Sequence, residues 1–439
     1  MGKTFLNDRF ASTYLNRMGK GKLGLKAQIR EETKMFMEYL EGEGEVDPST
    51  TLAKFTYNNI RRMMFGERWQ YADSSAAIKV FTDAMKSLHA ELALLTLADL
   101  APLFRYLPNV VRAKKESNEA VAYVQSFFRQ MIRKKIAKRD SVENEDFINA
   151  YLQAHETMDE KEISNLVDLC QDMFLAGTPT TSATLNFIII HLLNNPCWQE
   201  ELFHEITTAF QGGVPSMEDL EKLPKLEATI QETLRLNPNG PLIPRATAHV
   251  TKVRNYVVPA NCQVWFNIFH INHNPVTFPD PTAFSPQRWL CPDGTFRREY
   301  PYSKKYHWPF QVILHLLFSL LALVEECVWA NHWPGERFHA VGISAYSHIR
   351  MEMLLLLSTL IQRFVLSVPE GCKLPSGQLS GNALLVQPEQ YRLVLSRRTE
   401  VLEDSGHPCS PESAELYPEL TQMTASSICR KTSKNEKGI

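Results

Sequence analysis

Residues 176–181 read Ala-Gly-Thr-Pro-Thr-Thr and lie inside the longest helical pattern of the chain, which runs from 159 to 195. Inside a helix, glycine costs about 1 kcal/mol relative to alanine and proline costs about 3 kcal/mol. Pro179 also lacks an amide proton and crowds the carbonyl group of Leu175. The sequence therefore predicts a helix break beside three threonines. Such a break is either functional or a bend that only follows the core.

Outside this break the chain has the pattern of a mainly helical protein with one small β-rich region. Beyond Pro238, frequent prolines separate short runs such as 256–258 and 263–266, which is typical of short strands. Other segments show apolar residues at three- and four-residue spacing, which predicts amphipathic helices. These segments are 26–40, 51–140, 197–211, 217–237 and 351–365.

Composition excludes several protein classes. The chain has 439 residues and a net charge of −2, so it carries no basic field for nucleic acid. Hydrophobic residues make up 44% and charged residues 22%, which excludes a largely disordered chain and a multi-span membrane protein. The 8 cysteines show no C-x-x-C spacing and are too sparse for a disulfide scaffold, which favours a reducing compartment.

Glu232 and Arg235 share one helix face, and a third charge, Arg288, follows in the sequence Phe-Ser-Pro-Gln-Arg-Trp at 284–289. A pair of this kind is most often a surface ion pair that contributes little to stability. A glutamate held by two arginines would instead join a helix to a loop. We expect the three residues to have a structural, not a catalytic, role.

Five motifs occur together in one order. They are Ala-Gly-Thr-x-Thr-Thr at 176–181, Glu-Thr-Leu-Arg at 232–235, Pro-Arg at 244–245, His-Asn-Pro at 273–275, and Phe-Pro-Asp-Pro followed by Phe-Ser-Pro-Gln-Arg at 278–288. In this order they resemble the haem-thiolate monooxygenases, the cytochromes P-450, of the animal microsomal type. The resemblance covers residues 20–300 and resumes at 350–395. It implies an incomplete cytochrome P-450 fold, mainly α with a small β-rich region.

The resemblance implies a role for each matching residue. Thr180 would be the catalytic threonine that helps to deliver protons to iron-bound oxygen. Arg245 would pair with a haem propionate, and Ala176 and Gly177 would contact the cofactor. The structural triad would consist of Glu232, Arg235 and Arg288.

The resemblance also implies an activity. The family inserts one oxygen atom of O2 into apolar small molecules, and a flavoprotein reductase supplies electrons from NADPH. Haem is the expected cofactor, the endoplasmic reticulum membrane the expected location, and no nucleic-acid partner is expected. The N-terminal residues 1–19 contain no apolar run, so we expect no membrane anchor there, a start inside the domain, and a possible cytoplasmic location.

Three positions depart from the family pattern. Pro179 replaces the acidic residue usual before the threonine, and Gln287 replaces a glutamate. The glycine-rich loop that carries the haem cysteine is missing between Phe296 and Met351. That segment offers only Cys327, whose acidic and bulky neighbours disfavour a thiolate, so no metal ligand is recognisable beyond this weak candidate.

The codons around Cys327 provide an explanation. We combined the third base of each codon with the first two bases of the next. Each pair of neighbouring residues then gives one shifted codon. The codon from Cys327/Val328 can encode Cys. Three others can encode one residue only: Gly from Trp329/Ala330, Leu from His332/Trp333 and Ala from Trp333/Pro334. The shifted peptide reads Cys-x-Gly-Glu-x-Leu-Ala-Arg, which matches the family's haem loop and the helix after it. We therefore interpret 310–349 as this loop read in a shifted frame.

Other readings of 310–349 are weaker. Its apolar run, 310–324, is shorter than the roughly 20 residues that span a bilayer. Its histidines match no zinc signature, although one of them could replace the thiolate as haem ligand. We expect a partial domain over 1–395 and a polar, disordered tail over 396–439. Two functions stay open, a working haem monooxygenase and a non-catalytic relic that binds no haem, so enzyme activity is undecided.

Overall fold

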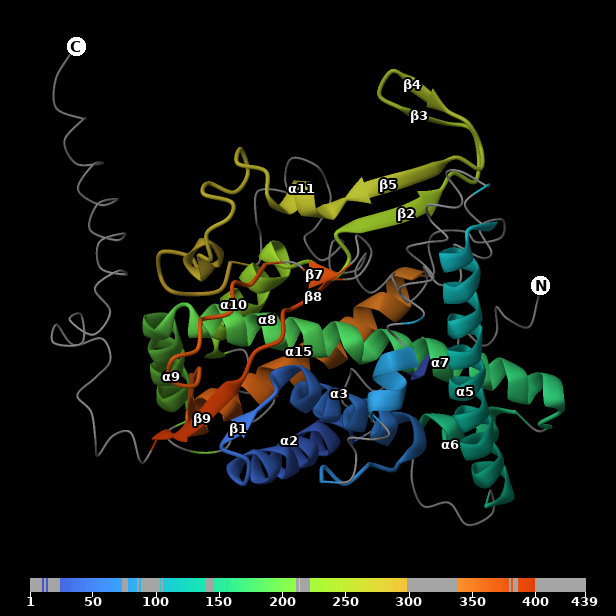
Figure 1. Ribbon diagram of the computed structural model, residues 1–439, viewed down its shortest axis with the longest axis horizontal. Helices are drawn as coiled ribbons and strands as arrows, with labels where there is room; N and C mark the ends of the chain where they lie inside the picture. The colour runs from blue at the N-terminus through green and yellow to red at the C-terminus, as the bar shows by residue number, and fades with distance from the viewer. Residues whose placement is uncertain are drawn as a thin grey trace, which may run out of the picture.

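The computed structural model describes residues 10–11, 13–14, 24–72, 78–84, 87, 103, 106–138, 146–155, 157–210, 213, 222–297, 338–378, 380–381 and 386–398. This part is mainly helical with small antiparallel sheets, which confirms the predicted fold class (Figure 1). Cys327, most of the segment 310–349, and the tail beyond 398 lie outside the described residues. The predicted domain boundary therefore stays a prediction.

The helices begin where the sequence offers capping residues. Asp47 accepts a hydrogen bond from the Ser49 amide, and Asp159 accepts one from the Glu162 amide, so each aspartate caps a helix. Several helices also begin with proline, whose missing amide proton costs nothing at that position. The helices are α2 Leu25–Glu41, α3 Pro48–Phe65, α5 Pro108–Ala137, α6 Phe147–Ala154, α7 Glu160–Gly177, α8 Pro179–Leu193, α9 Pro196–Phe210, α10 Pro224–Leu236, α11 Ile268–Asn272, α15 Phe338–Arg363 and the 3₁₀ helix η4 Pro286–Trp289.

The strands form short antiparallel pairings. The strand order β1-β9-β6 brings residues from both ends of the domain into one sheet, because Val46 lies opposite Leu393. In the β-rich region after α10, β2 pairs with β5, and the hairpin β3–β4 lies between them in the sequence. The strands are β1 Glu45–Val46, β2 Leu242–Ala246, β3 Thr251–Val253, β4 Tyr256–Val258, β5 Gln263–Asn267, β6 Phe364–Ser367, β7 Ser380–Gly381, β8 Val386–Gln387 and β9 Leu393–Arg397.

Two clusters of buried side chains hold the helices together. One lies where α3, α5, α6 and α7 meet and is rich in aromatic rings; Phe128 and Phe174 have ring centroids 5.4 Å apart. The other is aliphatic and joins α2, α8, α9, α10 and α15 through residues such as Ile189, Leu226 and Leu357. Each fully buried side chain of this kind contributes roughly 1.5–3 kcal/mol. The helix α8 has apolar residues on all sides because other elements surround it.

The structure corrects the predicted helix over 159–195. That segment forms two helices, α7 and α8, which are separated at Thr178. Pro179 is therefore the first residue of a helix and not an interior residue, so the expected penalty is largely avoided. The run Glu160–Leu193 is apolar and long enough to cross a membrane, but 81% of its most apolar window is buried inside the protein. Burial in the core accounts for this composition.

Two smaller boundaries also differ from prediction. The helix expected over 217–237 is described from Pro224 as α10, and the helix expected over 351–365 ends at Arg363, where β6 begins. The strands β1, β6 and β9 have no counterpart among the predicted elements, because pairs this short leave almost no periodic pattern.

Candidate functional site

The threonines at the helix break bond back to the helix through their hydroxyl groups. Pro179 lacks the amide proton that would otherwise bond to the carbonyl group of Leu175. Three threonine hydroxyls donate to the carbonyl four residues earlier: Thr178 to Phe174 (2.8 Å), Thr181 to Gly177 (2.9 Å) and Thr184 to Thr180 (2.9 Å). Hydroxyl groups that bond back in this way favour a bend in the helix.

Gly177 lies where α7 passes close to α3. A Cβ atom at this position would lie 2.6 Å from Cδ1 of Ile60, closer than real Cβ contacts. The glycine therefore permits close packing of the two helices. Its expected contact with a cofactor stays a prediction, as does that of Ala176, whose side chain lies outside the described residues.

Thr180 is half-buried in the first turn of α8. Its carbonyl oxygen accepts a hydrogen bond from Nδ2 of Asn239 at 3.0 Å, and the same Nδ2 lies 2.8 Å from Oγ1 of Thr184. Asn239 follows α10 in the chain and is 4% exposed. This buried amide fixes the start of α8 to the segment that follows the Glu232 helix. The role of the Thr180 hydroxyl stays a prediction.

His191 makes the same kind of link at the other end of α8. Its Nε2 lies 2.7 Å from Oδ1 of Asn237, and its ring stacks on Phe284 with centroids 4.5 Å apart. Burial lowers the pKa of His191 to about 4, which leaves the imidazole neutral at pH 7. Sequence reasoning missed Asn237 and Asn239; their only signal was two amides within a proline-rich turn just after Arg235.

The structure brings Glu232, Arg235 and Arg288 together. Oε1 of Glu232 accepts hydrogen bonds from Nη2 of Arg235 (2.8 Å) and Nε of Arg288 (3.0 Å), and Oε2 accepts one from Nε of Arg235 (2.9 Å). Glu232 and Arg235 are 0% exposed. The carboxylate also accepts hydrogen bonds from the Ser285 amide (3.0 Å) and the Trp289 indole (2.8 Å). No sequence pattern pointed to these last two donors.

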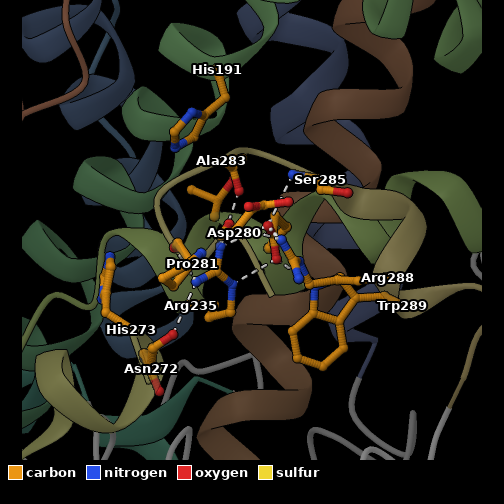
Figure 2. Close-up of polar contacts among 12 residues, drawn as sticks. His191, Arg235, Asn272, His273, Asp280, Pro281, Ala283, Ser285, Arg288 and Trp289 are labelled. Carbon is orange, nitrogen blue, oxygen red and sulfur yellow. Dashed lines mark hydrogen bonds and ion pairs between the residues drawn. The ribbon is translucent and has the colours of Figure 1, made fainter. Parts of the chain in front are cut away.

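Arg235 continues the network into the loop after α11 (Figure 2). Its guanidinium donates to the carbonyl oxygens of Asn272 (3.0 Å), Pro281 (2.7 Å) and Ala283 (3.2 Å). It also lies over the Phe278 ring, 5.1 Å from the centroid. One buried guanidinium thus holds three backbone carbonyl groups of the segment 272–283 against α10. This arrangement is architectural, because every donor of Arg235 is used by the protein itself.

Burial by itself raises the pKa of Glu232, but the hydrogen bonds and charge of Arg235 outweigh it. The Ser285 amide and the Arg288 charge act in the same direction, so the net effect is a lowered pKa. Glu232 is therefore a carboxylate at neutral pH. A group that is ionised and saturated with donors is poorly suited to proton transfer, which again favours a structural role.

Arg245 lies in β2, opposite Val264 of β5, and its side chain lies outside the described residues. Its proposed ion pair with a propionate therefore stays a prediction. The segment that contains Asn239 connects α10 to β2, and Asn239 bonds to Thr180 at the start of α8. Arg245 in β2 therefore lies on an element that adjoins both helices. Cys327 also lies outside the described residues.

Comparison with known proteins identifies the family to which this fold belongs. The family model for cytochrome P-450 matches residues 3–310. The chain belongs to the cytochrome P-450 family. Cytochrome P-450 2U1 of Rattus norvegicus is 27% identical over 89% of this chain and 69% of that relative. Cytochrome P-450 2H2 of Gallus gallus is 28% identical over 82% and 68%, and cytochrome P-450 2C8 of Homo sapiens is 26% identical over 88% and 74%.

The cytochrome P-450 family binds haem through a cysteine thiolate. We therefore ask whether the buried cysteine of α7 could be such a ligand. Cys170 lies on α7, two turns before Gly177, and is buried. Burial raises the pKa of its thiol well above the usual range, and the charges of Asp146 and Asp172 raise it further. Cys170 is therefore a protonated core residue and not a thiolate ligand. Among the described residues, no cluster of three or more His, Cys, Asp or Glu side chains could hold a metal.

The family-model match does not cover the whole chain. The match stops at residue 310, where the unusual segment 310–349 begins. The described residues of this cytochrome P-450 thus provide the helices and the Glu232 network that frame the site. Among them, Cys170 does not fit the haem iron as a thiolate ligand.

Proposed function

We propose that this chain is a cytochrome P-450 product in which the haem loop is read in a shifted frame, so that it binds no haem through a thiolate and is not catalytic. The observation that carries this proposal is the family match, which stops at residue 310, where the aberrant segment begins. Two facts support it. Burial raises the pKa of the Cys170 thiol, and Cys327 follows Glu325 and Glu326, whose two negative charges oppose a third on the sulfur.

The reaction proposed for the same gene read in frame is that of the family: O2-dependent insertion of one oxygen atom into an apolar small molecule. Haem would supply the oxygen chemistry, a flavoprotein reductase would supply electrons from NADPH, and the endoplasmic reticulum membrane would be the location. In such a product Thr180 would hold a proton, Arg245 would bind a propionate, and Ala176 and Gly177 would border the cofactor. Glu232, Arg235 and Arg288 would hold the core in either product.

A second candidate is a working monooxygenase whose iron is held by Cys327 or by a histidine of 310–349. The complete Glu232 network favours it, because an intact frame is what an active enzyme needs. The two candidates differ in one measurable property, the axial ligand.

The decisive measurement is the absorption spectrum of the reduced, CO-bound full chain after haem supplementation. We expect no thiolate-type band, because the sequence lacks the family's haem cysteine loop and burial holds the thiol of Cys170 protonated. A thiolate-type band that is lost in Cys327→Ala would overturn the proposal. A histidine-type band would establish the second candidate. Sequencing of the transcript across codons 310–350 is the independent check, and a shifted frame without Cys and Glu codons at the expected places would contradict the frame shift.

A further inference from the structure

The segment 375–377 is tied to α8 through a short chain of hydrogen bonds that includes His191. Nε2 of His191 lies 2.7 Å from Oδ1 of Asn237, and Nδ2 of Asn237 donates to the carbonyl oxygen of Gly377 at 3.0 Å. Because the amide nitrogen of Asn237 is turned toward Gly377, its oxygen accepts from the ring, so Nε2 carries the proton of the neutral imidazole. Nδ1 is therefore the atom that takes up a second proton in acid.

The backbone of this segment also lies against the ring. A Cβ atom at Gly377 would lie 3.8 Å from Cε1 of His191 and 3.3 Å from Cγ2 of Ile190. The carbonyl oxygen of Pro375 accepts a hydrogen bond from Nδ2 of Asn194 at 2.8 Å. Because the segment belongs to no helix or strand, these few contacts fix its place on α8.

On its other side the ring meets a firmly bonded part of the protein. It stacks on Phe284 with centroids 4.5 Å apart and planes 6° from parallel. The carbonyl oxygen of Ala283, just before Phe284, accepts a hydrogen bond from Arg235 (Figure 2). The amide of Ser285, just after it, donates to Glu232. When the ring has to reach water, the segment that covers it therefore yields more easily than the loop at Phe284.

We propose that His191 is an acid-operated latch: the neutral ring holds the segment 375–377 on α8, and protonation of the ring releases that segment. Burial lowers the pKa of His191 to about 4, and the charge of Arg235 acts in the same direction, whereas the hydrogen bond to Asn237 and the charge of Glu232 raise it. Because this pKa lies below the ordinary value of 6.5, the closed state is stable at neutral pH and loses stability as pH falls from 6.5 toward 4. The inference does not depend on haem, so it can fail or hold independently of the proposed function.

The test is hydrogen exchange of the full chain, read by mass spectrometry on peptides that cover 375–378 and corrected for the intrinsic pH dependence of exchange. With a pKa of about 4 in the closed state and 6.5 in the open state, opening of the segment should become about 20-fold more frequent between pH 7 and pH 5. Peptides from α5 report the rest of the domain and should change much less. An equal change in both sets of peptides would mean that the whole domain unfolds, and the latch would be wrong.

His191→Gln isolates the latch. Glutamine keeps an N–H group for Asn237 but takes up no proton, so the 20-fold change should shrink to less than about 3-fold. The matched control is His273→Gln, which changes another histidine that stacks on a phenylalanine, Phe269, and whose pKa burial also lowers. This control should keep the full pH dependence. If His191→Gln does not fold, Asn237→Asp serves instead, because a carboxylate beside Nε2 stabilises the protonated ring in the closed state and should weaken the pH dependence.

A carboxylate on the segment's own side supplies the competing explanation. Glu389 accepts a hydrogen bond from the Ser376 amide, so its protonation in acid also loosens this contact. Glu389→Gln removes that carboxylate and should leave most of the pH dependence in place. If the pH dependence instead persists in His191→Gln and disappears in Glu389→Gln, Glu389 carries the effect and the proposal for His191 is overturned.

Discussion

Glu232→Ala is expected to lower the free energy of unfolding by about 3–5 kcal/mol. The substitution leaves Arg235 buried at 0% exposure without its carboxylate, and it removes the acceptor for Arg288, Ser285 and Trp289. An uncompensated buried charge is far more costly than the loss of a surface ion pair. Urea unfolding of the full chain, followed by far-UV circular dichroism, measures this difference.

The matched control is Glu116→Ala on α5. Glu116 pairs with Arg112 at 2.9 Å, but both side chains are more than half exposed, so the loss should stay below about 0.5 kcal/mol. If Glu232→Ala does not fold, Arg288→Ala tests the same network more mildly, because Arg288 is 10% exposed. A loss under about 1 kcal/mol in both Glu232→Ala and Arg288→Ala would contradict the structural role assigned here.

Stability is expected to fall as pH rises from 4.5 to 8, in large part because of Glu352. This residue of α15 is 1% exposed, and burial raises its pKa to about 8. The nearby charge of Glu32 raises it further, while the Asn59 amide, 2.9 Å away, lowers it. The folded state therefore binds a proton that the unfolded state loses above its ordinary pKa near 4.5. Between these values stability decreases with pH, by an amount of the order of 5 kcal/mol.

Glu352→Gln isolates this contribution. Glutamine keeps an acceptor for Asn59 but cannot ionise, so the variant should lose most of this decline between pH 5 and 8. Glu205, whose pKa is raised to about 7 by burial, titrates in both proteins and cancels in the comparison. Urea midpoints at several pH values give the difference. Parallel pH profiles for the two proteins would show that Glu352 does not carry the effect.

The fold class and the break between α7 and α8 could be predicted from local chemistry. Helical periodicity marks the long helices, and Gly177 and Pro179 mark the point where one must end. The start of a new helix at Pro179 could not be predicted. It depends on which carbonyls the threonine hydroxyls and Asn239 satisfy, and these contacts exist only once distant elements are packed.

The grouping of Glu232, Arg235 and Arg288 was predictable in part. The i, i+3 spacing places the first two on one helix face, and the resemblance to cytochromes P-450 adds the third. No local pattern pointed to Trp289 or the Ser285 amide as further donors. Nor did any pattern identify Glu352 as a buried acid, because its surroundings come from α2 and α3, hundreds of residues away.

The sequence by itself therefore determined the mainly helical class and the family, because these depend on periodicity and motif order. The frame-shift interpretation of 310–349 stays a prediction. Only the tertiary structure decided which polar groups are buried together, which thiol is kept protonated and which apolar side chains stay in solvent. The physical reason is that burial and electrostatic environment are properties of contacts between distant segments, and no short stretch of sequence contains them.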